Sequence, residues 1–328
     1  MSIKIAVMGT GKVARANYLP YLTKQEDVTL TYFSRTREKA EECARDFGGQ
    51  VADSVPELLA DEPDAILVLT PETQRYEAVG LLLEGRPKRL FLEKPLVAQK
   101  GQANVCEDDF FKARDLLQRA GARGTETAMV FNYRFFDQTV RMQRIIADRG
   151  FGRLIHASMF VNYACWSHCI DLLHLFGGRA SQVSALSSET QFMNAVDVSG
   201  CFRLENEAIG TIIGTNGVNF DSPLYQIIFN FEQGTIRFND LDGPMDVYDK
   251  TTRYCETHSL IGNHSRWDQY NASFEKSLAA YLESIRRNEP PPVPGIAGLE
   301  ELQFEVALRR SIELERPVKV QDEFPLEN

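Results

Sequence analysis

The chain begins with a short apolar strand that runs directly into a glycine-rich turn. Lys4–Met8 predicts a buried strand, and Gly9, Gly11 and Ala14 then form a G-x-G-x-x-A pattern at the start of a helical stretch, Val13–Leu22. In such a unit the first glycine permits the tight turn, the second lets the backbone approach a pyrophosphate, and the small third residue packs the helix on the sheet. The pyrophosphate then lies at the positive end of the helix. The residues expected to bind a dinucleotide here are Gly9, Thr10, Gly11, Lys12 and Val13.

The end of the next strand indicates which dinucleotide is bound. Val28–Phe33 predicts the second strand, and it ends in Ser34, Arg35 and Thr36, followed by Arg37. An NAD site usually places an acidic residue here to bind the ribose hydroxyls. Hydroxyl and guanidinium groups suit a 2′-phosphate instead, so we expect NADP(H), with NAD(H) as the less favoured cofactor. The alternative is that both arginines belong to a solvated loop.

Composition narrows the class of protein further. A chain of 328 residues suits two domains, and 43% hydrophobic with 25% charged residues is ordinary for a globular protein. The net charge of −10 argues against nucleic acid or an anionic membrane as a partner. Without a secretory signal or a long apolar stretch, we expect a cytoplasmic location and reduced thiols for the six cysteines. Cys165 and Cys169 are close in sequence, but His168, Asp171 and His174 point in different directions around the helix. No metal site is therefore expected.

Strands and helices alternate as far as residue 131. Ala65–Leu69, Arg89–Leu92 and Ala128–Phe131 predict further strands, and Thr73–Leu83 and Asp109–Arg119 predict helices between them. This alternation is typical of a parallel sheet with crossover helices, whose ligands bind beyond the carboxyl ends of the strands. The segments at those ends are Thr70-Pro71-Glu72, Glu93-Lys94-Pro95 and Asn132-Tyr133-Arg134.

After Gly152 consecutive strands replace the alternation, which predicts an antiparallel sheet. Two helices, Ser273–Arg286 and Ala297–Leu314, follow with a proline-rich connector between them. We therefore expect an α/β protein with a doubly wound Rossmann domain at 1–125 and a second α/β domain with a mostly antiparallel open sheet at 126–328. The expected strands are Leu154–Tyr163, Ser181–Ser187, Val196–Leu204, Ala208–Gly214, Tyr225–Glu232 and Thr235–Asn239.

The order and spacing of these motifs resemble the Gfo/Idh/MocA oxidoreductases. The resemblance covers nearly the whole chain, including His168 with Asp171 in a helix that ends Leu175-Phe176-Gly177 and the stretch Pro290–Val318. It implies a cleft between the two domains, in which a sugar, cyclitol or related carbonyl compound is oxidised or reduced with a nicotinamide nucleotide. It also implies dimers or tetramers that form through the open face of the second sheet.

The resemblance implies roles for individual residues. Lys94 would stabilise the alkoxide charge that develops as hydride moves, and His168 would donate a proton to the carbonyl oxygen. The alternatives are a surface lysine before a proline turn and a packed, hydrogen-bonded histidine. The expected cofactor residues beyond the glycine turn are Ser34, Arg35, Thr36, Thr70, Pro71, Glu93 and Lys94. The expected substrate residues are Asn132, Arg134, Tyr163, Trp166 and His168.

The chain departs from the family pattern at two positions. Ala164 replaces an aspartate that family members acting on polyols commonly carry four residues before the histidine, and Tyr163 is a candidate replacement donor. Trp166 is a candidate sugar-stacking face, although both aromatic residues also suit a core. Arg75 stands where many members have histidine, which suggests an unusual substrate.

Two charged residues near these sites have alternative roles. Asp171 is expected to orient His168, or else to solvate its helix. Arg134 would bind an acidic group of the substrate or a structural carboxylate.

Three functions agree with these residues. The first is an NADP-dependent oxidoreductase acting on a small sugar-like or cyclitol-like compound. The second is a non-catalytic nucleotide-binding sensor or regulatory protein on the same fold, for which the missing acid at position 164 is the best argument. The third is a hydrolase that borrows a hydride transiently. Loops around Asn216–Tyr225 and Tyr254–Trp267 are expected to line the substrate pocket.

Overall fold

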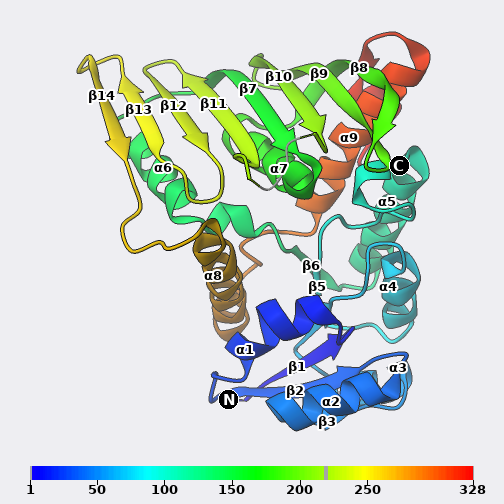
Figure 1. Cartoon of the computed structure of the whole chain (residues 1–328). Helices are drawn as coiled ribbons and strands as arrows, with labels where there is room; N and C mark the ends of the chain where they lie inside the picture. The colour runs from blue at the N-terminus through cyan, green and yellow to red at the C-terminus, as the bar shows by residue number, and fades with distance from the viewer. Residues whose placement is uncertain (1, 218–220, 328) are drawn as a thin grey trace. The chain divides into compact units, whose positions relative to one another are not determined.

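The computed structural model describes residues 2–217 and 221–327 (Figure 1). Residues 218–220, inside one of the loops expected to line the substrate pocket, lie outside the described part. The described chain groups into two compact units by its internal contacts. The first unit contains residues 2–101, 107–131 and 274–299, and the second contains 102–106, 132–273 and 300–327.

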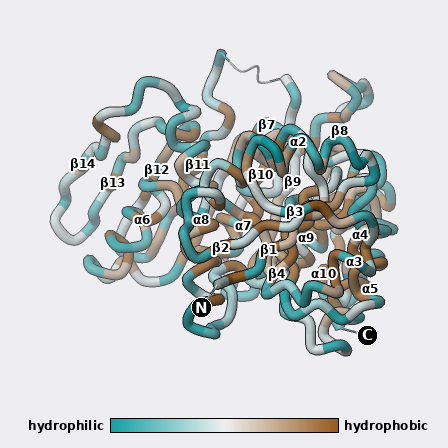
Figure 2. Tube along the Cα trace, turned by 90° about the horizontal axis from the view of Figure 1, so that it is seen from below, coloured by the Kyte–Doolittle hydropathy of each residue, from teal (hydrophilic) through white to brown (hydrophobic). Residues whose placement is uncertain are grey.

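The first unit is built on a six-stranded parallel sheet of order β3-β2-β1-β4-β5-β6. Every residue of β4 is buried, which explains its unbroken apolar sequence (Figure 2). The order of strands confirms the predicted doubly wound fold. The chain starts at the centre with β1, runs to one edge at β3, returns to the centre at β4 and then runs to the other edge at β6. The strands are β1 (Ile3–Met8), β2 (Val28–Phe33), β3 (Gln50–Val51), β4 (Ala65–Val68), β5 (Arg89–Leu92) and β6 (Glu126–Met129).

Helices follow these strands close to the predicted positions. The predicted helix Val13–Leu22 is a π-helix, η1 (Ala14–Tyr18), that continues as α1 (Leu19–Leu22). Ser54 begins α3 because its side chain accepts a hydrogen bond from the amide of Glu57. The remaining helices of the unit are α2 (Arg37–Phe47), α3 (Val55–Ala60), α4 (Arg75–Glu84) and α5 (Glu107–Ala122).

Residues 274–299 belong to the first unit, which differs from the expected boundary after residue 125. This segment includes most of α8 (Arg266–Arg287), the proline-rich connector and the start of α9 (Ile296–Leu314). The connector acts as an additional edge to β6, because the amide of Met129 donates to Val293 (3.0 Å) and that of Gly295 to Thr127 (2.8 Å). Contacts between residues far apart in sequence therefore decide the membership of these units.

The second unit is built on a nine-stranded sheet of order β14-β13-β12-β11-β7-β10-β9-β8-β15. Among the described strands of this sheet, only β7 and β10 pair in parallel, so the prediction of a mostly antiparallel sheet is confirmed. The strands are β7 (Leu154–Asn162), β8 (Ala180–Phe192), β9 (Ala195–Leu204), β10 (Ile209–Thr215), β11 (Tyr225–Phe231), β12 (Gly234–Asn239), β13 (Met245–Asp249), β14 (Tyr254–His258) and β15 (Val318–Lys319).

Several elements of this unit were not predicted from the sequence. Strands β13 and β14 lie towards one edge of the sheet and carry many polar residues, so they lack a strong apolar signal. Helix α6 (Asp137–Asp148) buries Gln138 and Thr139 beside Met142 and Ile145, so polar residues interrupt its apolar stripe. The other helices are η2 (Gln102–Asn104), η3 (Asn132–Phe135), η4 (Tyr163–Cys165), α7 (Trp166–Gly177) and α10 (Val320–Glu323).

The two faces of the nine-stranded sheet differ. Helices α6 and α7 lie along one face (Figure 1). On the other face the register aligns Leu186, Ser199, Ile213 and Phe160 in one row across four strands. Leu186 is 77% exposed, and Ile213 and Phe160 are each 37% exposed. This row is an apolar stripe on a face that solvent reaches.

Candidate active site

The glycine turn after β1 has the geometry expected for a nucleotide-binding loop. Gly9 has a φ of +103°, and a Cβ there would lie 2.8 Å from the backbone of Leu69 and Thr70, so only glycine fits. A Cβ on Gly11 would meet no atom within 4 Å, so its backbone faces open space. The first glycine is thus required by the neighbouring strand, and the second leaves room for a ligand.

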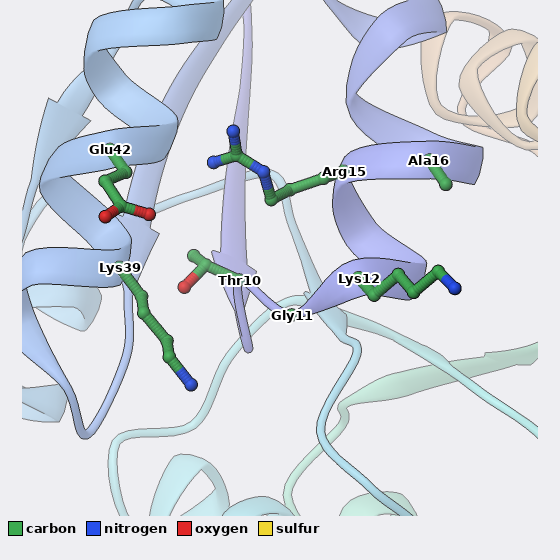
Figure 3. A pocket seen from close by; sticks show the side chains of 7 residues that line it. All are labelled: Thr10, Gly11, Lys12, Arg15, Ala16, Lys39 and Glu42. Carbon is green, nitrogen blue, oxygen red and sulfur yellow. The ribbon is translucent and has the colours of Figure 1, made fainter.

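A pocket of about 470 Å³ lies beside this turn, between η1 and α2 (Figure 3). Thr10 lies in it with a buried hydroxyl that has no hydrogen-bond partner among the described residues. Lys12 comes from the turn, and Lys39 comes from the first part of α2. The lining residues are Thr10, Gly11, Lys12, Arg15, Ala16, Lys39 and Glu42.

Arg15 and Lys39 are pocket residues that the sequence analysis missed. Arg15 pairs with Asp46 and donates to the Cys43 thiol (3.5 Å), so it connects η1 to α2. Lys39 has no ion-pair partner within the described chain, which leaves its ammonium group available to an anion. The position of Lys39 near the start of the helix after β2 could have identified it from sequence, because in Rossmann folds the adenosine ribose binds at the end of this strand.

The two arginines that follow β2 have different partners. Arg37 forms ion pairs with Glu41 (2.7 Å) and Asp53, so its charge is already balanced. Arg35 is exposed and donates to the side-chain oxygen of Gln74 (2.5 Å), an uncharged acceptor. Ser34 and Thr36 lie beside it at the strand end. Arg35 is therefore the arginine of this segment whose charge no carboxylate of the described chain balances.

Lys94 lies in a tightly braced segment beyond β5. The carboxylate of Glu93 accepts hydrogen bonds from the Lys94 amide (3.0 Å) and from the hydroxyl of Tyr18. The Lys94–Pro95 peptide is cis. Glu93 is buried, and its carboxylate braces the backbone of Lys94. The contact between Glu93 and a cofactor that the motif led us to expect stays a prediction.

Thr70 and Pro71 follow β4 at the same edge of the sheet. The Thr70 hydroxyl is buried and has no hydrogen-bond partner among the described residues, while its carbonyl accepts from Arg75. Arg75 itself is 2% exposed, and its terminal nitrogens donate to backbone carbonyls of the chain. Arg75 is thus engaged within the first unit, in contrast to the unusual substrate contact that its departure from the family pattern suggested.

His168 lies in α7 of the second unit and is 2% exposed. Its ring stacks on that of Tyr133, with centroids 4.1 Å apart and an interplanar angle of 9°. The Tyr133 hydroxyl donates to the Cys165 thiol (3.1 Å). The imidazole therefore has a fixed orientation set by aromatic stacking.

The sequence favoured Asp171 as the group that orients His168, but in the structure Asp171 pairs with Arg134. Its two carboxylate oxygens accept hydrogen bonds from Arg134, at 2.8 and 2.5 Å. Burial raises the pKa of the Asp171 carboxyl, and the neighbouring Arg134 opposes that shift. The pair places Arg134 on a structural carboxylate, which was one of its two expected roles.

Three expected substrate residues lie in the core of the second unit. The Tyr163 hydroxyl donates to the Val196 carbonyl (2.7 Å), and burial raises the pKa of Tyr163 to about 12. Trp166 packs on Gly214, where a Cβ would lie 2.6 Å from the indole ring. The Asn132 amide donates to Ser273 (2.7 Å). These contacts favour the core alternative for Tyr163 and Trp166, and a substrate role for the three residues stays a prediction.

The described residues contain no group of three or more metal-ligating side chains arranged to hold an ion. Within the same residues, no helix is sufficiently long and apolar to span a membrane.

Comparison with known proteins identifies the family. Residues 3–119 match the model of the Gfo/Idh/MocA oxidoreductase family, NAD-binding Rossmann fold. This match assigns the first part of the chain to the Gfo/Idh/MocA oxidoreductase family. The match confirms, over these residues, the resemblance drawn from the motifs, and the curated relatives are named dehydrogenases.

Individual relatives are distant. Glucose-6-phosphate 3-dehydrogenase of Bacillus subtilis is 24% identical over 46% of this chain and 40% of its own length. Myo-inositol 2-dehydrogenase of Thermotoga maritima is 21% identical over 98% of this chain and 99% of its own. A crystal structure of an oxidoreductase from Agrobacterium radiobacter, in complex with NAD⁺, L-tartaric acid and magnesium, has a TM-score of 0.81 at 13% identity. It covers 98% of this chain and 100% of its own, and at this identity it supports the fold alone.

Proposed function

We propose that this protein is an NADP(H)-dependent oxidoreductase that transfers a hydride between the nicotinamide and a small sugar-like or cyclitol-like compound. The observation that carries the cofactor preference is the end of β2, where Arg35 has no acidic partner in the described chain and Ser34 stands beside it. Lys39 adds a second cation from the adjoining pocket. A 2′-phosphate fits this charge, whereas an NAD site would normally supply a carboxylate.

The residues around the glycine turn fit a dinucleotide. The open backbone at Gly11 and the start of the helix at Lys12 and Val13 would hold the pyrophosphate. The hydroxyls of Thr10 and Thr70 have no partner among the described residues, and a bound nucleotide would satisfy them. When bound, the nicotinamide supplies or accepts the hydride.

Lys94 and His168 are the proposed catalytic residues. Lys94 would hold the reacting oxygen of the substrate and stabilise negative charge on it. His168 would exchange the proton with that oxygen, and its stacking on Tyr133 limits the directions in which its ring nitrogens can point. Neither role requires the aspartate that Ala164 replaces, provided that one proton-transfer group remains.

The substrate class rests on the relatives. The Bacillus subtilis relative is named for a sugar phosphate and the Thermotoga maritima relative for a cyclitol, and both names describe oxidation of a ring hydroxyl. A ring polyol or its ketone is therefore the class that we propose for this chain.

We also propose a cytoplasmic homodimer or homotetramer assembled through the open face of the nine-stranded sheet. The exposed row Leu186, Ile213 and Phe160 supports this assembly, because burying apolar side chains of this size is favourable.

The test is NADPH oxidation, followed at the nicotinamide absorbance band, against pooled aldoses, ketoses, inosones and dicarbonyls. Wild type is compared with Lys94→Ala and with Lys100→Ala, an exposed lysine of the same segment as a control. We expect turnover in wild type and Lys100→Ala, and a loss of at least about 100-fold in Lys94→Ala.

Other results identify the alternatives. Tight NADPH binding by wild type without any turnover, unchanged in Lys94→Ala, would support a nucleotide-binding sensor. Release of an aglycone from a glycoside without net absorbance change would support transient oxidation and hydrolysis.

A further inference from the structure

Arg75 occupies an unusual position at the start of α4. Its side chain is buried, and the guanidinium donates to the carbonyls of Glu93 (2.7 Å), Pro95 and Thr70 (2.7 Å). Two of these carbonyls flank Lys94 in sequence, and the third follows β4 at the neighbouring strand end. One side chain therefore ties together the two loops that surround the proposed catalytic lysine.

Burial of this guanidinium opposes its charge. Desolvation lowers the pKa of Arg75, and no carboxylate among the described residues forms an ion pair with it, although Glu93 is near enough to favour the charged form. An apolar side chain would fill the same volume without that desolvation cost. What an apolar side chain cannot supply is a planar set of donors that reaches three carbonyls at once.

The backbone of Lys94 is braced from the other side as well. Its amide donates to the Glu93 carboxylate (3.0 Å), which in turn accepts from the Tyr18 hydroxyl. The Glu93 side chain thus restrains the amide of Lys94, while Arg75 restrains the carbonyls before and after it. Removing Arg75 leaves the amide brace intact and frees the two carbonyls to rotate.

We propose that Arg75 is a positioning residue for Lys94, which fixes the backbone on both sides of the lysine and sets where its ammonium group lies. The inference rests on the proposed function, in which Lys94 acts on the reacting oxygen. A small displacement of a catalytic group is sufficient to cost about 100-fold in rate.

The test compares Arg75→Met, which removes all donors, with Arg75→Lys, which keeps a charge that cannot reach three carbonyls. Arg119→Met is the matched control, because Arg119 also donates to a helix carbonyl, that of Gly80 (3.4 Å), away from the strand ends. We expect Arg75→Met to lower kcat about 100-fold while the Kd for NADPH, measured by fluorescence, changes less than about threefold. Arg75→Lys should recover part of kcat, and Arg119→Met should resemble wild type.

A double variant separates positioning from general support of the fold. If Arg75 acts through Lys94, Arg75→Met should cause no further loss of turnover in the Lys94→Ala background. Hydrogen–deuterium exchange gives a readout that needs no substrate. We expect Arg75→Met to speed exchange over residues 93–98 by at least tenfold, with exchange over β1 unchanged.

Several results would overturn the inference. These are a multiplicative loss in the double variant, a rise in the NADPH Kd equal to the fall in kcat, or unchanged exchange over residues 93–98. If Arg75→Met does not fold, Arg75→Lys carries the same measurements. Full turnover in Lys94→Ala would refute the proposed function itself, whereas a loss there without a loss in Arg75→Met would refute only the role of Arg75.

Discussion

Replacing Arg35 with alanine should weaken NADPH binding much more than NADH binding. In the structure the guanidinium is exposed at the end of β2 and is oriented by its hydrogen bond to Gln74 (2.5 Å), without a carboxylate of the described chain to balance it. In the proposed function its partner is the 2′-phosphate of NADPH, a group that NADH lacks.

The magnitude follows from the exposure of the side chain. A hydrogen bond to a charged group contributes about 1.5–3 kcal/mol, and solvent screening places the exposed Arg35 at the lower end. A loss of about 1.5 kcal/mol corresponds to a rise of about tenfold in the Kd for NADPH. Lys39→Ala removes a more flexible point charge, so we expect a rise of about threefold.

The assay is titration of nicotinamide fluorescence for NADPH and NADH at 50 mM and 500 mM salt. Arg45→Ala is the control, since Arg45 is an exposed arginine of α2 that does not line the pocket. The Arg35 effect should shrink at high salt, because screening weakens exposed charges. Equal weakening of both nucleotides by Arg35→Ala, or an equal effect of Arg45→Ala, would refute the reasoning.

Three further predictions concern the second unit. Asp171→Asn leaves the charge of Arg134 without its carboxylate and should lower the free energy of unfolding in urea. We expect a loss of about 3 kcal/mol, the lower end for a broken buried pair, because 18% of the Arg134 side chain is exposed. A loss below about 1 kcal/mol would contradict this. His174 has buried ring nitrogens without described partners, and burial lowers its pKa from 6.5 to about 3. The unfolded chain therefore binds the proton first, and the free energy of unfolding falls as pH decreases from about 6.5 towards 3. His174→Phe should reduce this dependence on pH by up to about 1.4 kcal/mol per pH unit. Equal dependence in wild type and variant would exclude the effect. Ile213→Glu should convert the proposed oligomer to monomer in sedimentation with unchanged circular dichroism, and an intact oligomer would place the interface elsewhere.

Local patterns were sufficient to predict the parallel sheet of the first unit and the strand-rich character of the second. The turn requires glycine at position 9, because a Cβ there would collide with the backbone of Leu69 and Thr70, just after β4. The missing acid after β2 is also visible in sequence, because the end of this strand is the position where NAD sites usually carry an acidic residue. Strands such as β4 are apolar throughout because both faces of a parallel sheet are covered.

Only the tertiary structure decided which partner each polar side chain has. Asp171 pairs with Arg134, 37 positions away, and the sequence offered His168, one helical turn away, as the nearer choice. Arg75 likewise reaches carbonyls 18 and 20 positions along the chain.

The sequence by itself determined that a strand and a glycine turn begin a Rossmann fold, because those features depend on neighbours in the chain. Tertiary structure decided that the proline-rich connector joins β6, and that Tyr163 and Trp166 pack into a core. The physical reason is that backbone conformation and side-chain periodicity are local, whereas burial and hydrogen-bond partners depend on segments that only folding brings together.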